Sequence, residues 1–137
     1  MSVVADASFI VSALVEEEHT GFVVRAFPDL AGQGLAAPAL IIWEVTNICA
    51  MKQRRGLLTE EEAQDALDLF LSLPIELDAE LTSLPDGLTL ARRHGLTAYD
   101  AAYLELAVRA GGVLATLDKA LTRAALSEGL TVHSPFA

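Results

Sequence analysis

The stretch "SVVADASFIVSALVEEEH" (residues 2–19) decides the fold. It opens with a short run of β-branched residues that ends at Asp6, and apolar residues at helical spacing follow. This order is typical of a strand that leads directly into a helix. Asp6 therefore stands at a junction between the two.

The rest of the chain repeats this alternation of strands and helices. Further short strands are expected at 35–38, 75–77, 112–118 and 130–133. Helices are expected at 21–27, 39–55, 60–72, 87–95, 97–110 and 119–129. The helix at 39–55 is apolar almost all round, which predicts that it is buried. The alternation predicts one α/β domain over residues 1–137, with three layers and a mostly parallel sheet.

The composition indicates a protein with a large core and no membrane span. Hydrophobic residues make up 53% of the chain, and the mean hydropathy is +0.42. No apolar run approaches the roughly 20 residues that a membrane-spanning helix needs. The excess apolar surface predicts a homodimer. A start without a signal peptide and a single cysteine, Cys49, predict a cytoplasmic protein.

The charge excludes simple adsorption to a polyanion. Nineteen acidic residues against nine basic ones give a net charge of −10, which argues against passive binding to nucleic acid or to an anionic membrane. A polyanionic substrate would need a metal ion or a local basic patch. The sign of the charge suits a basic protein partner.

Two acids, Asp6 and Asp118, follow predicted strands, where parallel sheets place their ligand sites. Either could instead be no more than the N-cap of the next helix. Asp100 has a similar alternative, since Thr97 and Asp100 have the spacing of a capping box. Glu44 differs, because it projects from an apolar helix face where an ionised carboxylate without a partner is costly.

Taken together, the four acids predict a metal site. Clustered carboxylates repel one another unless a divalent cation lies between them. Oxygen ligands without a histidine or cysteine array favour Mg²⁺, with Mn²⁺ as a possible substitute, over zinc.

The residues resemble a PIN-domain ribonuclease of the VapC toxin type. The resemblance rests on "DAS" at Asp6, "WEVTN" around Glu44, "TAYDAAYLELA" around Asp100 and "LATLDKAL" around Asp118, and it covers essentially the whole chain. It implies a PIN-like sheet with strand order 3-2-1-4-5. It also implies Mg²⁺-dependent endonucleolytic cleavage of RNA and inhibition by a cognate VapB-type antitoxin.

The resemblance also assigns roles to individual residues. Asp6 and Asp100 would be metal ligands, and Asp118 would complete the ion shell, directly or through water. Glu44 would hold or polarise the attacking water. Ser8 and Thr116 match polar positions beside the acids and would support them.

Other features of the chain leave alternatives open. A receiver-like signalling domain has a similar size and class, and a catalytically silent binding module would keep the acids. Two basic clusters, Lys52 with Arg54 and Arg55, and Arg92 with Arg93, could contact RNA or simply complement helix dipoles. Three aromatic residues could stack on bases, although packing in a core or a dimer is the favoured interpretation: Trp43, Tyr99 and Tyr103.

Overall fold

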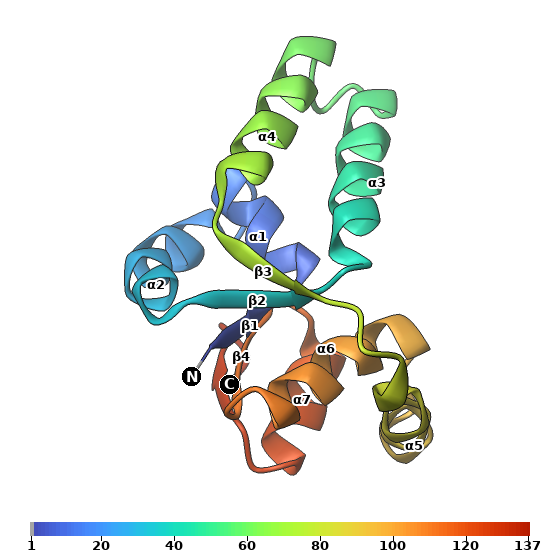
Figure 1. Ribbon diagram of the computed structural model, residues 1–137. Helices are drawn as coiled ribbons and strands as arrows, with labels where there is room; N and C mark the ends of the chain where they lie inside the picture. Colours follow the sequence, from blue (N-terminus) through green and yellow to red (C-terminus); the bar gives the residue numbers. More distant parts are fainter. Residues whose placement is uncertain (1) are drawn as a thin grey trace.

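Five parallel strands form one sheet in the order β3-β2-β1-β4-β5 (Figure 1). The computed structural model describes residues 2–137. The strands are β1 (Val3–Ala5), β2 (Leu35–Pro38), β3 (Ile75–Asp78), β4 (Val113–Ala115) and β5 (Thr131–His133). In the central register, Val4 of β1 pairs with Ala36 on one side and Leu114 on the other. The strand order is the one that the resemblance implied, and it reverses between β1 and β4.

Helices cover both faces of the sheet and form the two outer layers. The helical segments are α1 (Ala7–Leu14), α2 (Thr20–Gln33), α3 (Ile41–Arg54), α4 (Glu60–Ser72), the 3₁₀ turn η1 (Leu81–Ser83), α5 (Leu84–His94), α6 (Ala98–Arg109) and α7 (Lys119–Ser127). In Figure 1, α1, α3 and α4 lie on one side of the sheet, and α5, α6 and α7 lie on the other. The predicted three-layer α/β class is confirmed.

The core lies on both sides of β1, whose residues are all buried. Phe9 and Ile10 of α1 cover one face, and Tyr103 and Leu104 of α6 belong to the same buried cluster. A strand buried on both faces needs apolar residues throughout, which explains the continuous "VVA" run. The sheet's carboxyl edge is therefore held by rigid, fully packed strands.

Two prolines lie inside helices whose predicted bounds were different. The predicted end of α2 before Pro28 is wrong, because the helix continues to Gln33. Pro28 and Val24 are both exposed, so water can reach the carbonyl that the proline leaves unpaired, while buried Leu30 anchors the next turn. Helix α5 begins at Leu84, earlier than expected, because Pro85 is well tolerated in a first turn.

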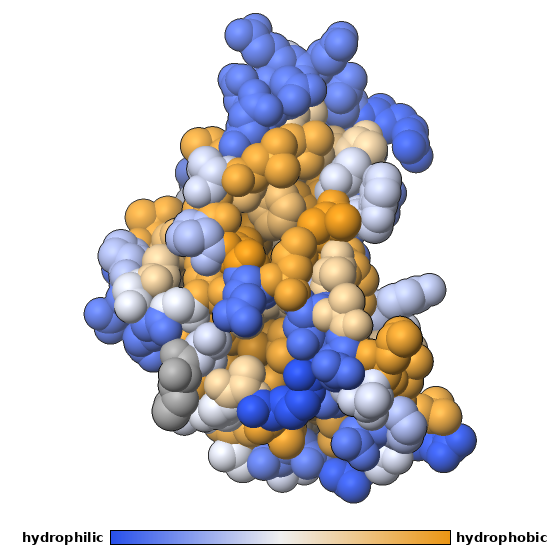
Figure 2. All heavy atoms as spheres, in the orientation of Figure 1, coloured by the Kyte–Doolittle hydropathy of each residue, from blue (hydrophilic) through white to orange (hydrophobic). Residues whose placement is uncertain are grey.

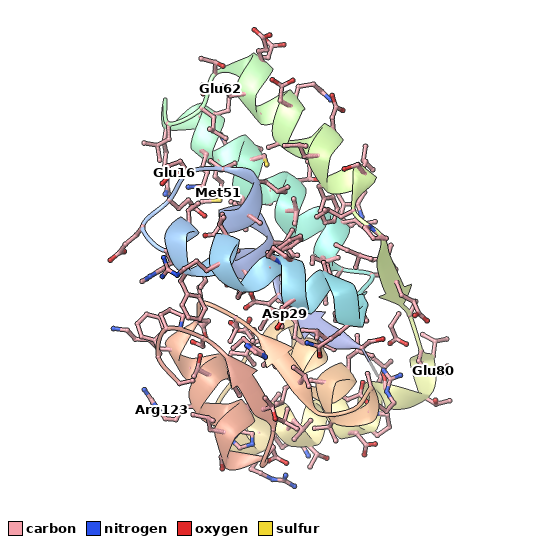
Figure 3. All side chains as sticks on the ribbon, turned by 90° about the vertical axis from the view of Figure 1, so that its left-hand side faces the viewer. Glu16, Asp29, Met51, Glu62, Glu80 and Arg123 are labelled. Carbon is pink, nitrogen blue, oxygen red and sulfur yellow. The ribbon has the colours of Figure 1, made fainter. Side chains whose placement is uncertain are left out.

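The prediction that the apolar helix α3 is buried is also wrong. Only Ile41, Val45 and Cys49 of this helix are buried. Helices α3 and α4 extend away from the sheet as a pair in Figure 1, so α3 packs on one side only. The far end of this pair is hydrophilic in Figure 2, and Glu62, which completes the capping box of α4, projects there in Figure 3.

Candidate active site

Asp6 is buried at the end of β1 and is held by three hydrogen-bond donors. Its side chain is 6% exposed. Ser8 Oγ and the backbone N of Phe9 donate to Oδ1 at 2.7 and 3.0 Å, and Thr116 Oγ1 donates to Oδ2 at 2.5 Å. Burial raises the pKa of Asp6 to about 6, although these hydrogen bonds oppose the shift. The carboxylate is thus a fixed but poorly solvated anion.

The ends of β1 and β4 are joined where the strand order reverses. Thr116 Oγ1, besides donating to Asp6, accepts from the backbone N of Asp118 at 3.0 Å. Ser8 Oγ accepts from the backbone N of Leu117 at 3.1 Å. These two hydroxyls therefore fix Asp6 relative to the backbone at Leu117 and Asp118.

Asp6 and Asp118 both cap helices, so the structural alternative is confirmed for each. Asp6 caps α1 through Phe9, and Asp118 Oδ2 accepts from the backbone N of Leu121 at 2.7 Å at the start of α7. In each case the cap uses one carboxylate oxygen, and the second oxygen of Asp6 accepts from Thr116. Capping and a place in the site are compatible here, since both helices start at the sheet's carboxyl edge.

Asp100 is half-buried in the first turn of α6, and Thr97 caps this helix through the backbone N of Asp100. Thr97 Oγ1 accepts from the backbone N of Asp100 at 3.1 Å. Within residues 2–137 the reciprocal bond of a full capping box is found at Thr59 and Glu62 but not at Thr97. Burial and the nearby charge of Asp118 raise the pKa of Asp100.

Glu44 lies in the first turn of α3, and Tyr103 of α6 holds it. The Tyr103 hydroxyl donates to Glu44 Oε1 at 2.5 Å. Burial raises the pKa of Glu44, the Tyr103 hydrogen bond opposes that shift, and the charge of Asp100 adds to it. Burial and the contact with Glu44 raise the pKa of Tyr103, so its hydroxyl stays a donor.

The four acids form a chain of mutually repelling neighbours. The charge of Asp118 raises the pKa of both Asp6 and Asp100, and the charge of Asp100 raises that of Glu44. None of the ion pairs found within residues 2–137 involves these four carboxylates. In that part of the chain, no three Asp, Glu, His or Cys side chains already converge as a metal site. Their oxygen chemistry nevertheless suits a hard divalent cation.

Tyr103 is the site residue that the sequence interpretation missed. It is 1% exposed, so its assignment to the core was correct, but its hydroxyl also reaches Glu44. The signal was present, because a buried tyrosine hydroxyl needs a partner and Glu44 needed one too. Core packing of the other two aromatic residues is not found, since Trp43 is 72% and Tyr99 66% exposed.

Cys49 and two of the basic residues take structural positions. Cys49 is buried, and burial raises the pKa of its thiol, in agreement with its interpretation as a core residue. In the basic clusters, Lys52 pairs with Glu17 at 2.6 Å and Arg93 pairs with Glu128 at 2.8 Å. No helix within residues 2–137 is both long and apolar enough to cross a bilayer.

The receiver-like alternative does not fit this sheet. Its strand order would be 2-1-3-4-5, whereas the order here is 3-2-1-4-5.

Comparisons with known proteins agree with this architecture. A family model described as PIN domain matches residues 3–126. Ribonuclease VapC3 of Pyrobaculum aerophilum is 41% identical over 125 residues, which cover 88% of this chain and 92% of that protein. The crystal structure of PAE2754 from Pyrobaculum aerophilum matches with a TM-score of 0.69 and 26% identity, over 96% of this chain and 83% of that one. VapBC2 from Rickettsia felis, bound to a DNA fragment from their promoter, matches with a TM-score of 0.69 and 19% identity over 98% of both chains. The chain belongs to the PIN-domain family, and within it to the VapC group.

Proposed function

We propose that this protein is a metal-dependent endoribonuclease and the toxin of a type II toxin–antitoxin pair. The observation that carries the proposal is the group of four carboxylates at the sheet's carboxyl edge, which lack ion-pair partners within residues 2–137. Acids in this state are costly unless a cation joins them. The name of the VapC3 relative supports RNA as the substrate.

Asp6, Asp100 and Asp118 would hold Mg²⁺, or Mn²⁺ in its place. Three carboxylates without a neutral nitrogen or sulfur ligand fit a hard cation of this kind. When bound, the ion neutralises charge on the phosphate and activates a water molecule. Ser8 and Thr116 orient Asp6, and Thr116 also fixes the backbone of Asp118, so the ligands need little rearrangement.

Glu44 would orient the attacking water and take up its proton. Tyr103 occupies Oε1, which leaves Oε2 for the water. The pKa of Glu44 is raised by burial, and a raised pKa makes a carboxylate a better base near neutral pH. Tyr103 then acts as a positioning residue, since it touches Glu44 and not the substrate.

We further propose a cognate VapB-type antitoxin as partner, a homodimer as the assembly and the cytoplasm as the place of action. The similar Rickettsia felis structure is named VapBC2, which joins VapB to VapC, and it supports the antitoxin through family membership. The net charge of −10 suits a partner with basic residues. Exposed leucines around η1 and α5 support self-association.

The decisive experiment uses purified, antitoxin-free protein and a mixed cellular RNA pool. Wild type, Asp100→Asn and the control Asp65→Asn, an exposed acid on α4, are compared with Mg²⁺ and with chelator. Asn at position 100 leaves the Thr97 cap in place, because that cap uses the backbone N. Discrete fragments are expected from wild type and Asp65→Asn with Mg²⁺ only. Cleavage that survives chelator or Asp100→Asn would contradict the proposal.

A folded, Mg²⁺-binding protein that leaves all RNA intact would favour a catalytically silent binding module. Mg²⁺-dependent cleavage that disappears in Asp6→Asn would exclude that module.

A further inference from the structure

Two large aromatic side chains beside the acids are exposed to solvent. Trp43 precedes Glu44 in the first turn of α3, and Tyr99 precedes Asp100 in the first turn of α6. Both helices bury other apolar residues in the core. The two rings are therefore exposed because of where they lie on their helices. Exposed aromatic rings next to a polar site are typical binding groups.

Trp43 and Tyr99 lie in the first turns of two helices that meet at one junction. Tyr99 and Tyr103 are four residues apart and so share a face of α6. Because Tyr103 reaches Glu44, that face is turned towards the first turn of α3. Figure 1 shows the starts of α3 and α6 close together at the carboxyl edge of the sheet. Leu40, which precedes α3, lines a hollow together with Ala98 and Ala102 of α6, which confirms this proximity.

Charge near the acids offers a polyanion little attraction. Of the nine basic residues, Lys52, Arg93 and Arg109 are engaged in ion pairs. Lys119, which directly follows Asp118, brings one charge close to the acids and lies over the ring of Phe136 at 5.1 Å. Arg54 is ten positions from Glu44 along α3, or about 15 Å of helix. With a net charge of −10, binding of RNA here would gain from a contribution that does not depend on cations.

We propose that Trp43 and Tyr99 stack on bases of single-stranded RNA on either side of the bond to be cleaved. Stacking is tolerant of sequence, because every base has a π-face, and it does not require basic residues. The inference rests on the proposed nuclease function and adds to it: the substrate is unpaired at the site, and its bases are held by rings while the carboxylates act on the phosphate.

Trp43 gives a direct measurement, because it is the only tryptophan in the chain. Its fluorescence is followed while a short single-stranded RNA is added to Asp100→Asn protein in the presence of Mg²⁺. Saturable quenching is expected, with a smaller effect from the same RNA annealed to its complement. An unchanged spectrum under conditions where a filter assay shows RNA binding would overturn the proposal.

Kinetics on the same substrate tests both rings. Trp43→Ala and Tyr99→Ala should each raise KM by about 5- to 150-fold, the range for loss of one base stack, with a smaller change in kcat. Tyr99→Phe keeps the ring, so its KM should rise far less than that of Tyr99→Ala. Leu71→Ala, which removes another exposed apolar side chain on α4, is the matched control. Equal KM values for Tyr99→Ala and wild type would overturn the role of Tyr99.

Light scattering separates stacking from self-association. The variants should keep the mass of wild type, whereas a change from dimer to monomer in Trp43→Ala would show that a second copy covers the ring and would overturn the proposal. The nuclease function is tested separately, since it stands if Asp100→Asn abolishes cleavage even where Trp43→Ala leaves KM unchanged.

Discussion

The hydroxyl of Tyr103 donates to Oε1 of Glu44 at 2.5 Å and joins two helices whose contacting residues are 59 positions apart. This hydrogen bond connects the buried face of α6 to the first turn of α3, and it places Glu44 near enough to Asp100 to feel its charge. One oxygen of Glu44 is thereby fixed by the core itself, and the orientation of the other follows from it. The acid least expected from its apolar surroundings is thus held by a residue of the core.

Tyr103→Phe is expected to lower kcat and to move the acidic limb of its pH profile upwards. The hydrogen bond favours ionised Glu44, so its loss raises the pKa of that acid. A bond to a charged group is worth about 1.5–3 kcal/mol, or about one to two pH units. Leu71→Ala, at an exposed leucine of α4, is the control and should keep the profile of wild type. An unchanged profile in Tyr103→Phe would remove Tyr103 from the site.

Asp6 should make the metal-free protein more stable as the pH falls. The pKa of Asp6 is about 6 in the folded protein against an ordinary value of 3.8. Between these values the folded state holds the additional proton, so stability rises as the pH falls through 6 and gains no more below 3.8. The shift in pKa corresponds to about 3 kcal/mol of the free energy of unfolding, which is lost above pH 6.

Urea unfolding in chelator tests this linkage. Asp6→Asn should be more stable than wild type at about pH 8, and the difference should vanish near pH 4. The comparison between variants is needed because acids such as Glu128, whose pKa is lowered by Arg93 and His94, act in the opposite direction. Asp29→Asn, at an exposed acid of α2, should parallel wild type. If the free energies of unfolding of Asp6→Asn and wild type differed by the same amount at both pH values, burial would not be the cause of the raised pKa.

The sequence was sufficient for those acids whose place follows from topology. Asp6 directly follows a strand, and Asp118 lies shortly after another. Parallel strands end at one edge of the sheet, so the alternation of strands and helices was enough to predict that these two acids are close. Trp43 and Tyr103 could not be assigned in this way. Both lie in apolar helices, and only the packing of α3 on one side and of α6 against the sheet decides which ring is exposed and which is buried.

Millimolar Mg²⁺ should raise the melting temperature of wild type at neutral pH. An ion that binds only the folded state stabilises it by mass action, by about 2.7 kcal/mol at a hundred times its Kd. Asp118→Asn should lose this response but remain folded, because Asn also caps a helix and can accept from Leu121. Asp65→Asn should respond like wild type. Equal shifts in Asp118→Asn and wild type would show that Mg²⁺ binds elsewhere.

A homodimer is expected through the surface formed by η1 and α5. Leu81, Leu84 and Leu88 are exposed there and line a hollow of about 330 Å³, in which most of the lining is apolar. Leu84→Glu should convert the protein to a monomer in light scattering, since it places a charge in that surface. The change suits the helix itself, because an acid is favourable in a first turn. Leu71→Glu, at an exposed leucine of α4, should leave the mass unchanged. A monomeric wild type at working concentration would refute the dimer, and a dimer that survives Leu84→Glu would place its interface on another surface.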